Sequence, residues 1–333
     1  MNISIIGCGK QAPKHISGLI ERDDVERIIV ADLIFQQAEK LASSYEQKVE
    51  AATIDSIFEN ADIDGVIIST PTPSHFELCQ RAIDAGKPFL VEKPLAATLP
   101  EAQALLESSQ KNNVPGMVGF IYRFSPTYEV FNKVLKTEDV LGAPSHALFR
   151  IAGRGSHQVW KHKSDKNGGA ISEMMVHMID LAVWYFGSAT EISLLNTDIV
   201  RPQRMINGEE VECDAEDWSI AHLLMENGTR VLIQADMMSP LFKQYAEING
   251  ANGIIEGSIQ PHYDDSLSLF EGRGAYEKGY QKLDTPKANN YVSQGQCFLD
   301  MVRSGDDPDR CSLKDAVEVM RIQDTLKGLM ISK

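Results

Sequence analysis

The chain has 333 residues, of which 43% are hydrophobic and 24% are charged, and its formal net charge is -15 at pH 7. This length is enough for two domains, and the composition is typical of a globular protein. The negative charge argues against nucleic acid or an anionic membrane as the main partner, and no apolar run approaches the roughly 18 residues that a membrane-spanning helix needs.

The first predicted strand, residues 2–6, runs directly into the sequence Gly-Cys-Gly-Lys-Gln-Ala at residues 7–12. A G-x-G-x-x-A pattern between a strand and a helix is typical of dinucleotide binding: the first glycine permits the tight turn, the second lets the backbone approach a pyrophosphate, and the small alanine lets the helix pack on the strand. Free N–H groups at the start of the helix favour a phosphate. The expected cofactor contacts here are Gly7, Gly9, Lys10, Gln11 and Ala12.

The second predicted strand, residues 27–31, ends at Asp32, about where a ribose-binding acid belongs. Its carboxylate would bond the ribose hydroxyls and repel a 2′-phosphate. The next residues, Leu33, Ile34 and Phe35, cannot hold that phosphate, so we expect NAD rather than NADP. The alternative is that Asp32 only caps the helix expected at 35–44.

Further strands are expected at 49–53, 65–69, 88–91 and 115–120, separated by helices that include 99–112. Strands that alternate with helices predict a doubly wound parallel sheet of the Rossmann type, over residues 1–122. Ligands collect at the carboxyl ends of such strands. The residues expected to border the cofactor there are Ser69, Thr70, Pro71, Thr72, His75, Glu92 and Lys93. For Lys93, the alternative is an ordinary surface lysine.

Residues 123–333 are expected to form a second domain, for substrate binding and oligomerisation. A strand at 145–152 and a helix after Gly168 and Gly169 are followed by strand pairs that flank Asn-Gly dipeptides, and helices are expected at about 288–303 and 313–331. Asn-Gly between alternating segments is a strong hairpin signal. The pattern predicts an α+β domain built on a large open, mostly antiparallel sheet.

Glu173, His177 and Asp180 are four and three residues apart, so on an α-helix they form one polar stripe among apolar residues. Burying such groups without partners is costly, and a satisfied structural network is one interpretation. No ligand spacing for zinc is present, and no metal is expected. The alternative interpretation is a substrate site.

A basic stretch lies just before this helix. Residues 150–166 hold five Lys or Arg residues and one acid, in an otherwise acidic chain. A phosphate or carboxylate on the substrate would be attracted there, with contacts from Arg154 and Lys161, and Trp160 could stack on a sugar ring. The alternative is a solvated loop whose charges balance nearby acids.

Several ordered motifs make the chain resemble the Gfo/Idh/MocA oxidoreductases over essentially its full length. They are the glycine motif with His15, Thr70-Pro71 followed by His75, Glu92-Lys93-Pro94, Arg123-Phe124-x-Pro126, and residues 168–180. The resemblance implies that Lys93 contacts nicotinamide and a substrate hydroxyl before a cis proline, that His177 accepts the alcohol proton, and that Arg123 and Asp180 border the substrate. Glu173 stands where the family usually has Asp.

The expected function is therefore NAD-dependent oxidation of a secondary alcohol of a sugar, cyclitol or sugar derivative, with Lys93, His177 and Glu173 as catalytic residues. Two alternatives remain: an NAD-dependent glycosidase that oxidises its substrate transiently, and a non-catalytic regulator of the same fold. The family resemblance implies a homodimer or homotetramer formed through the second-domain sheet. Five scattered cysteines without a C-x-x-C pair favour reduced thiols in the cytoplasm.

Overall fold

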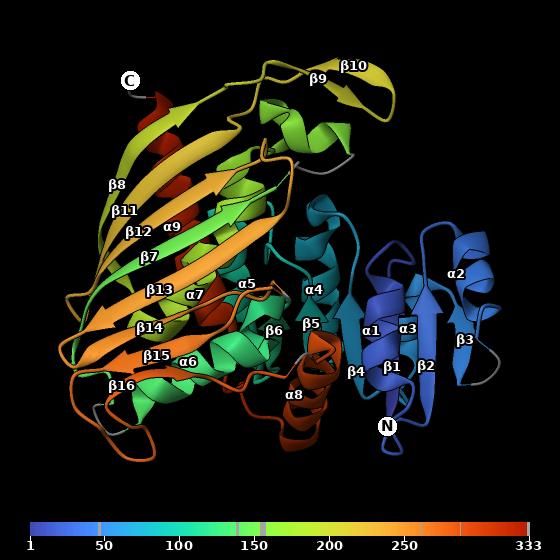
Figure 1. The fold of residues 1–333 in the computed structure, drawn as a ribbon. Coiled ribbons are helices and arrows are strands. Elements are labelled where there is room, and N and C mark those ends of the chain that lie inside the picture. Colours follow the sequence, from blue (N-terminus) through green and yellow to red (C-terminus); the bar gives the residue numbers. More distant parts are fainter. Residues whose placement is uncertain (46–47, 138–139, 154–157, 261, 287, 332–333) are drawn as a thin grey trace. The chain divides into compact units, whose positions relative to one another are not determined.

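The computed structural model describes residues 1–333 except 46–47, 138–139, 154–157, 261, 287 and 332–333 (Figure 1). The chain forms two compact units. The first contains Met1–Phe124 and Ala288–Met320, and the second contains Ser125–Lys287 and Arg321–Lys333. The sequence predicted one division, after residue 122, and left 288–320 with the second domain. In the structure this segment belongs to the first unit, because its helix packs there.

The first unit is a doubly wound sheet of six parallel strands in the order β3-β2-β1-β4-β5-β6, which confirms the predicted fold (Figure 1). Both faces of such a sheet are covered, and its central strands are accordingly apolar. The strands are β1 (Asn2–Ile6), β2 (Arg27–Ala31), β3 (Val49–Ala52), β4 (Gly65–Ile68), β5 (Phe89–Val91) and β6 (Gly116–Val118); the helices are α1 (Ala12–Leu19), α2 (Phe35–Ala42), α3 (Ile54–Glu59), α4 (His75–Asp84), α5 (Leu99–Asn112) and α8 (Asn290–Ser304).

The strand order reverses between β1 and β4, which run side by side. Connections from these two strands leave in opposite directions at this point, so a crevice for a ligand forms beyond their carboxyl ends. The loops after β1 and β4 and the turn after β5 all start at this edge of the sheet. The fold therefore brings together three stretches that are widely separated in the sequence.

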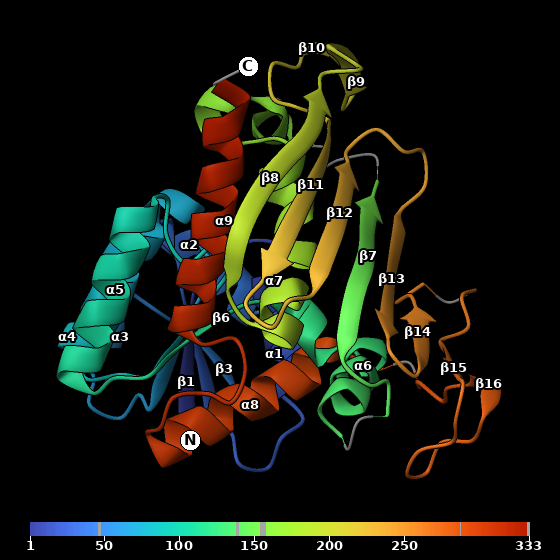
Figure 2. The ribbon, with the colours of Figure 1, turned by 90° about the vertical axis from the view of Figure 1, so that its left-hand side faces the viewer.

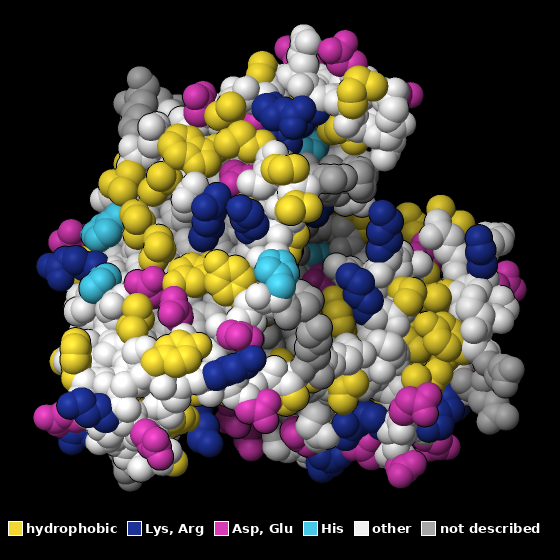
Figure 3. Space-filling view, viewed as in Figure 1, with side chains coloured by type: hydrophobic (Ala, Val, Ile, Leu, Met, Phe, Trp, Pro, Cys, Tyr) yellow, Lys and Arg dark blue, Asp and Glu magenta, His cyan; other side chains and the backbone are white. Residues whose placement is uncertain are grey.

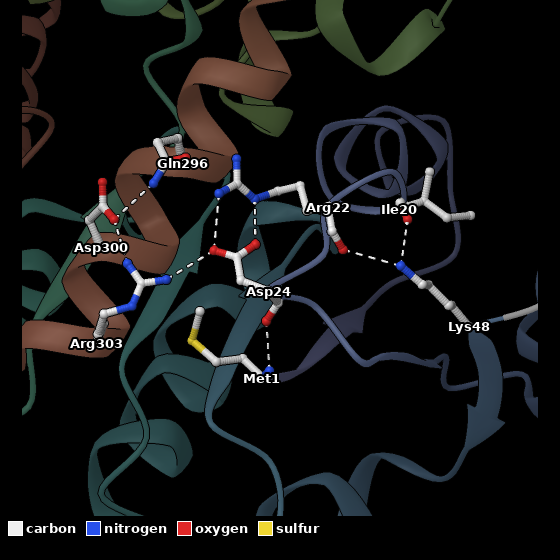
Figure 4. A network of polar contacts seen from close by, with 8 residues as sticks. All are labelled: Met1, Ile20, Arg22, Asp24, Lys48, Gln296, Asp300 and Arg303. Atoms are coloured by element: carbon white, nitrogen blue, oxygen red, sulfur yellow. Dashed lines mark hydrogen bonds and ion pairs between the residues drawn. The ribbon is translucent and has the colours of Figure 1, made fainter.

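Helix α8 is the part of the C-terminal segment that completes the first unit. Its Phe298 is fully buried, and a side chain larger than hydrogen at Gly65 would collide with Phe298 and Val302. Near the end of α8, Arg303 donates to Asp24, which lies in the turn between α1 and β2, at 2.9 Å. Asp24 also accepts two hydrogen bonds from Arg22 (Figure 4). These exposed ion pairs add little stability, so apolar packing holds α8 in place.

The second unit contains an eight-stranded sheet in the order β16-β15-β14-β13-β7-β12-β11-β8, mostly antiparallel as predicted; only β7 and β12 pair in parallel. Helix α7 and the later part of α9 lie against one face (Figure 2). The strands are β7 (Pro144–Ala152), β8 (Ala189–Asp198), β11 (Trp218–Met225), β12 (Arg230–Asp236), β13 (Lys243–Gly250), β14 (Gly253–Gly257), β15 (Ser266–Leu269) and β16 (Gly279–Lys282); the helices are α6 (Pro126–Lys136), α7 (Val176–Phe186) and α9 (Leu313–Ile331), of which the residues from Arg321 belong to this unit.

Several strands of the second unit were not predicted. The edge strand β8 has an irregular polar pattern and pairs with β11 through register shifts. The others are β15 and β16 at the opposite edge and a separate hairpin formed by β9 (Gln203–Ile206) and β10 (Glu209–Glu212). The predicted helix after Gly169 begins as a π-helix, Ile171–Met175, before α7 starts. Within the described residues, none of the helices is both long and apolar enough to cross a bilayer.

Candidate active site

The loop after β1 has the geometry that dinucleotide binding requires. Gly7 has φ +96°, and a Cβ atom there would lie 2.8 Å from the backbone carbon of Ser69, so this position admits only glycine. A Cβ atom at Gly9 would meet no atom within 4 Å, which leaves the backbone open to an approaching phosphate. Helix α1 begins immediately afterwards, with Ala12 fully buried against the sheet. The loop fits a pyrophosphate.

Asp32 lies at the end of β2, at the mouth of this loop. Its Oδ2 atom accepts a hydrogen bond from the backbone N–H of Cys8 at 2.8 Å, and its Oδ1 atom accepts one from Ile34 at 2.9 Å. The side chain is half-exposed, and Leu33 beside it is 91% exposed. A carboxylate held at this place and followed by apolar side chains fits the ribose of NAD and opposes a 2′-phosphate.

The loop after β4 holds four of the other predicted cofactor residues, Ser69, Thr70, Pro71 and Thr72, at the edge where the strand order reverses. Lys10 is exposed in the loop after β1. The Ser69 hydroxyl donates to the carbonyl of Gly7 at 2.7 Å, and Ser74 donates to the Thr70 hydroxyl at 2.8 Å. The first contact joins the loops after β1 and β4, and the second holds the loop after β4 together.

His75 differs from its predicted role. It was expected to border the cofactor, but it is 1% exposed, because it faces inward from the first turn of α4. Its Nδ1 atom lies 2.7 Å from the carbonyl oxygen of Pro94, and its Nε2 atom lies 2.9 Å from that of Thr70. Burial lowers the pKa of His75. This histidine joins the loop after β4 to the turn after β5.

Lys93 follows β5 and is half-exposed at the predicted edge; the Lys93–Pro94 peptide is cis, as the resemblance implied. Glu92 was expected to bind the cofactor, but its carboxylate lies 2.9 Å from Nε2 of His15 on α1. Burial alone would raise the pKa of Glu92, but the hydrogen bond and charge of His15, with Lys93 nearby, lower it. Glu92 is thus an ionised support behind Lys93.

Arg123 was expected to contact the substrate, and the structure gives it another partner. It is fully buried in the first unit, where its guanidinium donates to Asp315 at 2.5 Å. A buried guanidinium needs such a carboxylate. The pair ties the end of the Rossmann segment to the start of α9, and Arg123 is therefore a structural residue.

In the second unit, Glu173 and His177 lie on consecutive turns, the first in the π-helix and the second in α7; π-helical turns occur frequently at functional sites. His177 is half-exposed. Asp180 was expected on the same polar stripe, but it is 1% exposed, because α7 turns this position into the core. The stripe therefore consists of Glu173 and His177.

Lys161 is the residue of the basic stretch that reaches this stripe. Its ammonium lies 2.5 Å from Oε2 of Glu173, whose side chain is only 10% exposed, and 5.2 Å from the ring centroid of Trp160. Trp160 is 42% exposed. Arg154, also predicted to bind substrate, lies outside the described residues.

Two supporting residues could not be recognised from local sequence patterns. Glu216 accepts a hydrogen bond from the backbone of Ile171 at 2.9 Å, and a Cβ atom at Gly169 (φ +106°) would lie 2.2 Å from one of its oxygens. Glu216 thereby fixes the start of the helix that carries His177. Tyr291 on α8 donates to the side-chain oxygen of Gln11 at 3.2 Å. The Gly168-Gly169 pair was the one available signal, and it marks the close approach of Glu216.

Comparison with known proteins agrees with this geometry. Residues 1–120 match the model of an oxidoreductase family with an NAD-binding Rossmann fold, and residues 133–256 match the C-terminal domain model of the same family. The chain is 26% identical to scyllo-inositol 2-dehydrogenase (NAD(+)) of Bacillus subtilis (strain 168), over 92% of this chain and 87% of that protein. It is also 26% identical to inositol 2-dehydrogenase of Rhizobium meliloti (strain 1021), over 82% and 80%.

Solved structures show the same fold. Levoglucosan dehydrogenase in complex with NADH has a TM-score of 0.88 and 19% sequence identity, over 100% of this chain and 97% of that chain. An oxidoreductase from Agrobacterium radiobacter in complex with NAD+, L-tartaric acid and magnesium has a TM-score of 0.84 and 18% identity, over 98% and 95%. The chain thus belongs to the Gfo/Idh/MocA family of oxidoreductases, whose N-terminal domain is an NAD-binding Rossmann fold.

Proposed function

We propose that the protein is an NAD-dependent dehydrogenase that oxidises a secondary alcohol of a sugar or cyclitol. The observation that carries the proposal is the position of Lys93. It follows the carboxyl end of β5, at the same edge of the sheet as the glycine loop, in a chain that also offers a half-exposed His177. Further support comes from the names of the relatives, which are inositol dehydrogenases. When bound, NAD accepts the hydride from the alcohol carbon.

The proposed roles of the protein's own residues follow from their chemistry. His177 takes the hydroxyl proton, since a half-exposed imidazole can exchange protons near neutral pH. The Lys93 ammonium donates a hydrogen bond to the same hydroxyl oxygen and stabilises the negative charge that develops there. Glu173 accepts a hydrogen bond from a neighbouring substrate hydroxyl while its ion pair with Lys161 holds the carboxylate in place.

We further propose that the substrate is neutral. Three cations of the basic stretch lie near carboxylates: Lys161 at 2.5 Å from Glu173, Lys166 at 3.2 Å from Asp165, and Arg150 at 3.9 Å from Asp236. These pairs cancel much of the positive charge that would attract a phosphate or uronate. A neutral inositol or sugar fits such a site better than an anionic or nucleotide-linked sugar.

The test is a substrate panel with NAD, containing inositols, neutral sugars and the matching uronates, read out as NADH formation. We expect net NADH from at least one free neutral polyol or sugar, with the matching uronate at least tenfold poorer in kcat/KM. Net NADH from a free sugar also distinguishes a dehydrogenase from a glycosidase that reduces its intermediate back. A panel without NADH formation, in a protein shown to bind NAD, would contradict the proposal.

The Lys161–Glu173 pair gives a second prediction. Lys161→Glu places two carboxylates together at a mostly buried place, and we expect a loss of about 1–3 kcal/mol in the free energy of unfolding. The swapped variant, Lys161→Glu with Glu173→Lys, restores the pair and most of the stability. Its activity stays low, because a lysine cannot accept the substrate hydroxyl hydrogen.

Chemical denaturation and steady-state kinetics on the same preparations measure both effects. The control is Lys166→Glu, which changes the exposed ion pair with Asp165. For this variant we expect a loss of less than about 0.5 kcal/mol in the free energy of unfolding. Full activity in the swapped variant would remove Glu173 from the proposed site.

We also propose that the outer face of the second-unit sheet joins two copies of the chain. Alternate residues of its strands point away from the helices, and the apolar residues among them include Leu148, Ile220, Leu224, Leu232 and Tyr245. Figure 3 shows hydrophobic side chains spread over these strands, with charged side chains among them. Exposed apolar side chains gathered on a sheet face are typical of a protein interface.

Leu232→Glu tests this interface, because Leu232 pairs directly with Leu148 on the neighbouring strand at the middle of the sheet. A charge buried between two copies is costly, so we expect the variant to sediment as a monomer and the native protein as a dimer or tetramer. The control is Phe270→Glu, which changes a 72% exposed apolar residue elsewhere. An unchanged sedimentation coefficient for Leu232→Glu would assign the contact to another surface.

A further inference from the structure

Glu92, the residue directly before Lys93, is held on two sides within the first unit. Its Oε1 atom lies 2.9 Å from Nε2 of His15, which is 4% exposed, and a Cβ atom at Gly119 would lie 3.1 Å from its Oε2 atom. A carboxylate can only accept, so Nε2 of His15 carries the hydrogen. The Glu92 side chain is thus enclosed between His15 and Gly119, directly before the turn that carries Lys93.

Tyr291 connects the same histidine to the glycine loop. Its ring packs edge-on against His15, with centroids 5.2 Å apart and an interplanar angle of 88°. Its hydroxyl donates to Oε1 of Gln11, the residue that precedes the first turn of α1, at 3.2 Å. Burial, with Glu92 nearby, raises the pKa of Tyr291, so the hydroxyl keeps its hydrogen and remains a donor.

Close packing of α8 on α1 fixes the position of Tyr291. A Cβ atom at Gly18 would lie 2.3 Å from the carbonyl oxygen of Tyr291, and one at Gly295 would lie 3.0 Å from the carbonyl oxygen of Gly18. Asn289 at the start of α8 also donates to Ser17 at 3.3 Å. Two glycines thus let the helix backbones approach until Tyr291 reaches the first turn of α1.

We propose that Tyr291 and His15 are positioning residues of the cofactor site: Tyr291 fixes Gln11 beside the pyrophosphate loop, and His15 fixes Glu92 and thereby the turn that carries Lys93. The part that concerns Lys93 rests on the proposed function; the part that concerns cofactor affinity does not. Side chains that served packing alone would not need these polar atoms. Here both polar groups are directed at residues that adjoin the cofactor loops, and a Glu92 carboxylate without His15 would lose this hydrogen bond.

Three variants test the proposal: Tyr291→Phe, which removes one oxygen atom, His15→Leu, which removes the donor to Glu92, and His15→Gln, which offers a side-chain N–H in its place. Calorimetry measures the dissociation constant of NAD, and thermal unfolding measures the melting temperature of the cofactor-free protein. Steady-state kinetics with the best substrate measure kcat. Tyr280→Phe is the control, because Tyr280 is 68% exposed.

We expect Tyr291→Phe to raise the dissociation constant of NAD by roughly threefold to tenfold, the size of one lost hydrogen bond, with little change in the melting temperature. His15→Leu should raise the dissociation constant of NAD at least as much and lower kcat at least about tenfold. His15→Gln should return both the dissociation constant and kcat most of the way to their native values. Tyr280→Phe should match the native protein in every measurement.

An NAD dissociation constant within twofold of the native value, in either Tyr291→Phe or His15→Leu, overturns the assignment of that residue. If His15→Gln and His15→Leu lost NAD affinity and kcat equally, ring packing rather than the hydrogen bond to Glu92 would explain the effect. That result would overturn the role of His15 as a positioning residue. If His15→Leu does not fold, Tyr291→Phe and His15→Gln still decide the question. Should the native protein oxidise no alcohol, the calorimetric results stand on their own, so failure of this proposal is distinguishable from failure of the proposed function.

Discussion

Replacing His177 by Ala, or Lys93 by Met, is expected to lower kcat by roughly two or more orders of magnitude, the scale of a lost proton-transfer group. His177→Ala removes the acceptor of the alcohol proton. Lys93→Met keeps the length of the side chain and removes the charge that stabilises the developing alkoxide. Steady-state kinetics at saturating NAD measure both effects. Because NAD is held by the first unit, His177→Ala should bind NAD with native affinity in calorimetry.

Matched controls for these variants exist within the same chain. His262 and Lys111 are exposed and are not among the predicted site residues, and His262→Ala and Lys111→Met should retain native kcat. Turnover within about threefold of the native enzyme in His177→Ala or Lys93→Met would remove that residue from the catalytic set. Loss of NAD binding in His177→Ala would indicate misfolding rather than a chemical role.

The second large effect is expected at Asp32. A carboxylate beside a 2′-phosphate costs several kcal/mol, so the native protein should prefer NAD over NADP on the order of 100-fold or more. Asp32→Ser removes this repulsion and one anionic acceptor for the ribose, so NAD binding weakens and NADP binding improves. The preference for NAD over NADP should therefore fall at least about tenfold. The serine hydroxyl can still accept from the N–H of Cys8, which limits damage to the loop.

Dissociation constants of both cofactors, measured by calorimetry, decide this prediction. Asp23→Ser is the matched control, because Asp23 is exposed and lies outside the fingerprint. Native protein that bound NADP more tightly than NAD would contradict the assigned role of Asp32. An unchanged ratio in Asp32→Ser would mean that other groups, such as the exposed Leu33 and Ile34, set the preference.

The sequence predicted the fold and the edges where the site residues gather, because both depend on local patterns. Alternating strands and helices indicated the doubly wound sheet, and strand ends indicated where Asp32 and Lys93 lie. The Asn-Gly dipeptide at 227–228 indicated the hairpin of β11 and β12. Strand β8 was missed because an edge strand with register shifts lacks a clean alternation.

Which way a polar side chain points was much harder to predict. His75, Arg123 and Asp180 occur in motifs beside the site, yet each is at most 1% exposed. Their orientation depends on partners that are distant in sequence, such as Asp315 for Arg123. A motif specifies the residue type and its place along the chain, but burial is decided by packing between segments that the motif does not contain.

The return of residues 288–320 to the first unit bears on protein engineering. A chimera that transplants residues 1–124 alone, to give another enzyme a new cofactor preference, would separate α1 from the Tyr291 that packs beside it and leave Leu19 and Gly65 with foreign neighbours in place of α8. The transferable cassette is discontinuous: it needs both segments, with three splice points near residues 124, 288 and 320. Grafts built on the first segment alone should misfold or bind the dinucleotide weakly, whatever residue they carry at position 32.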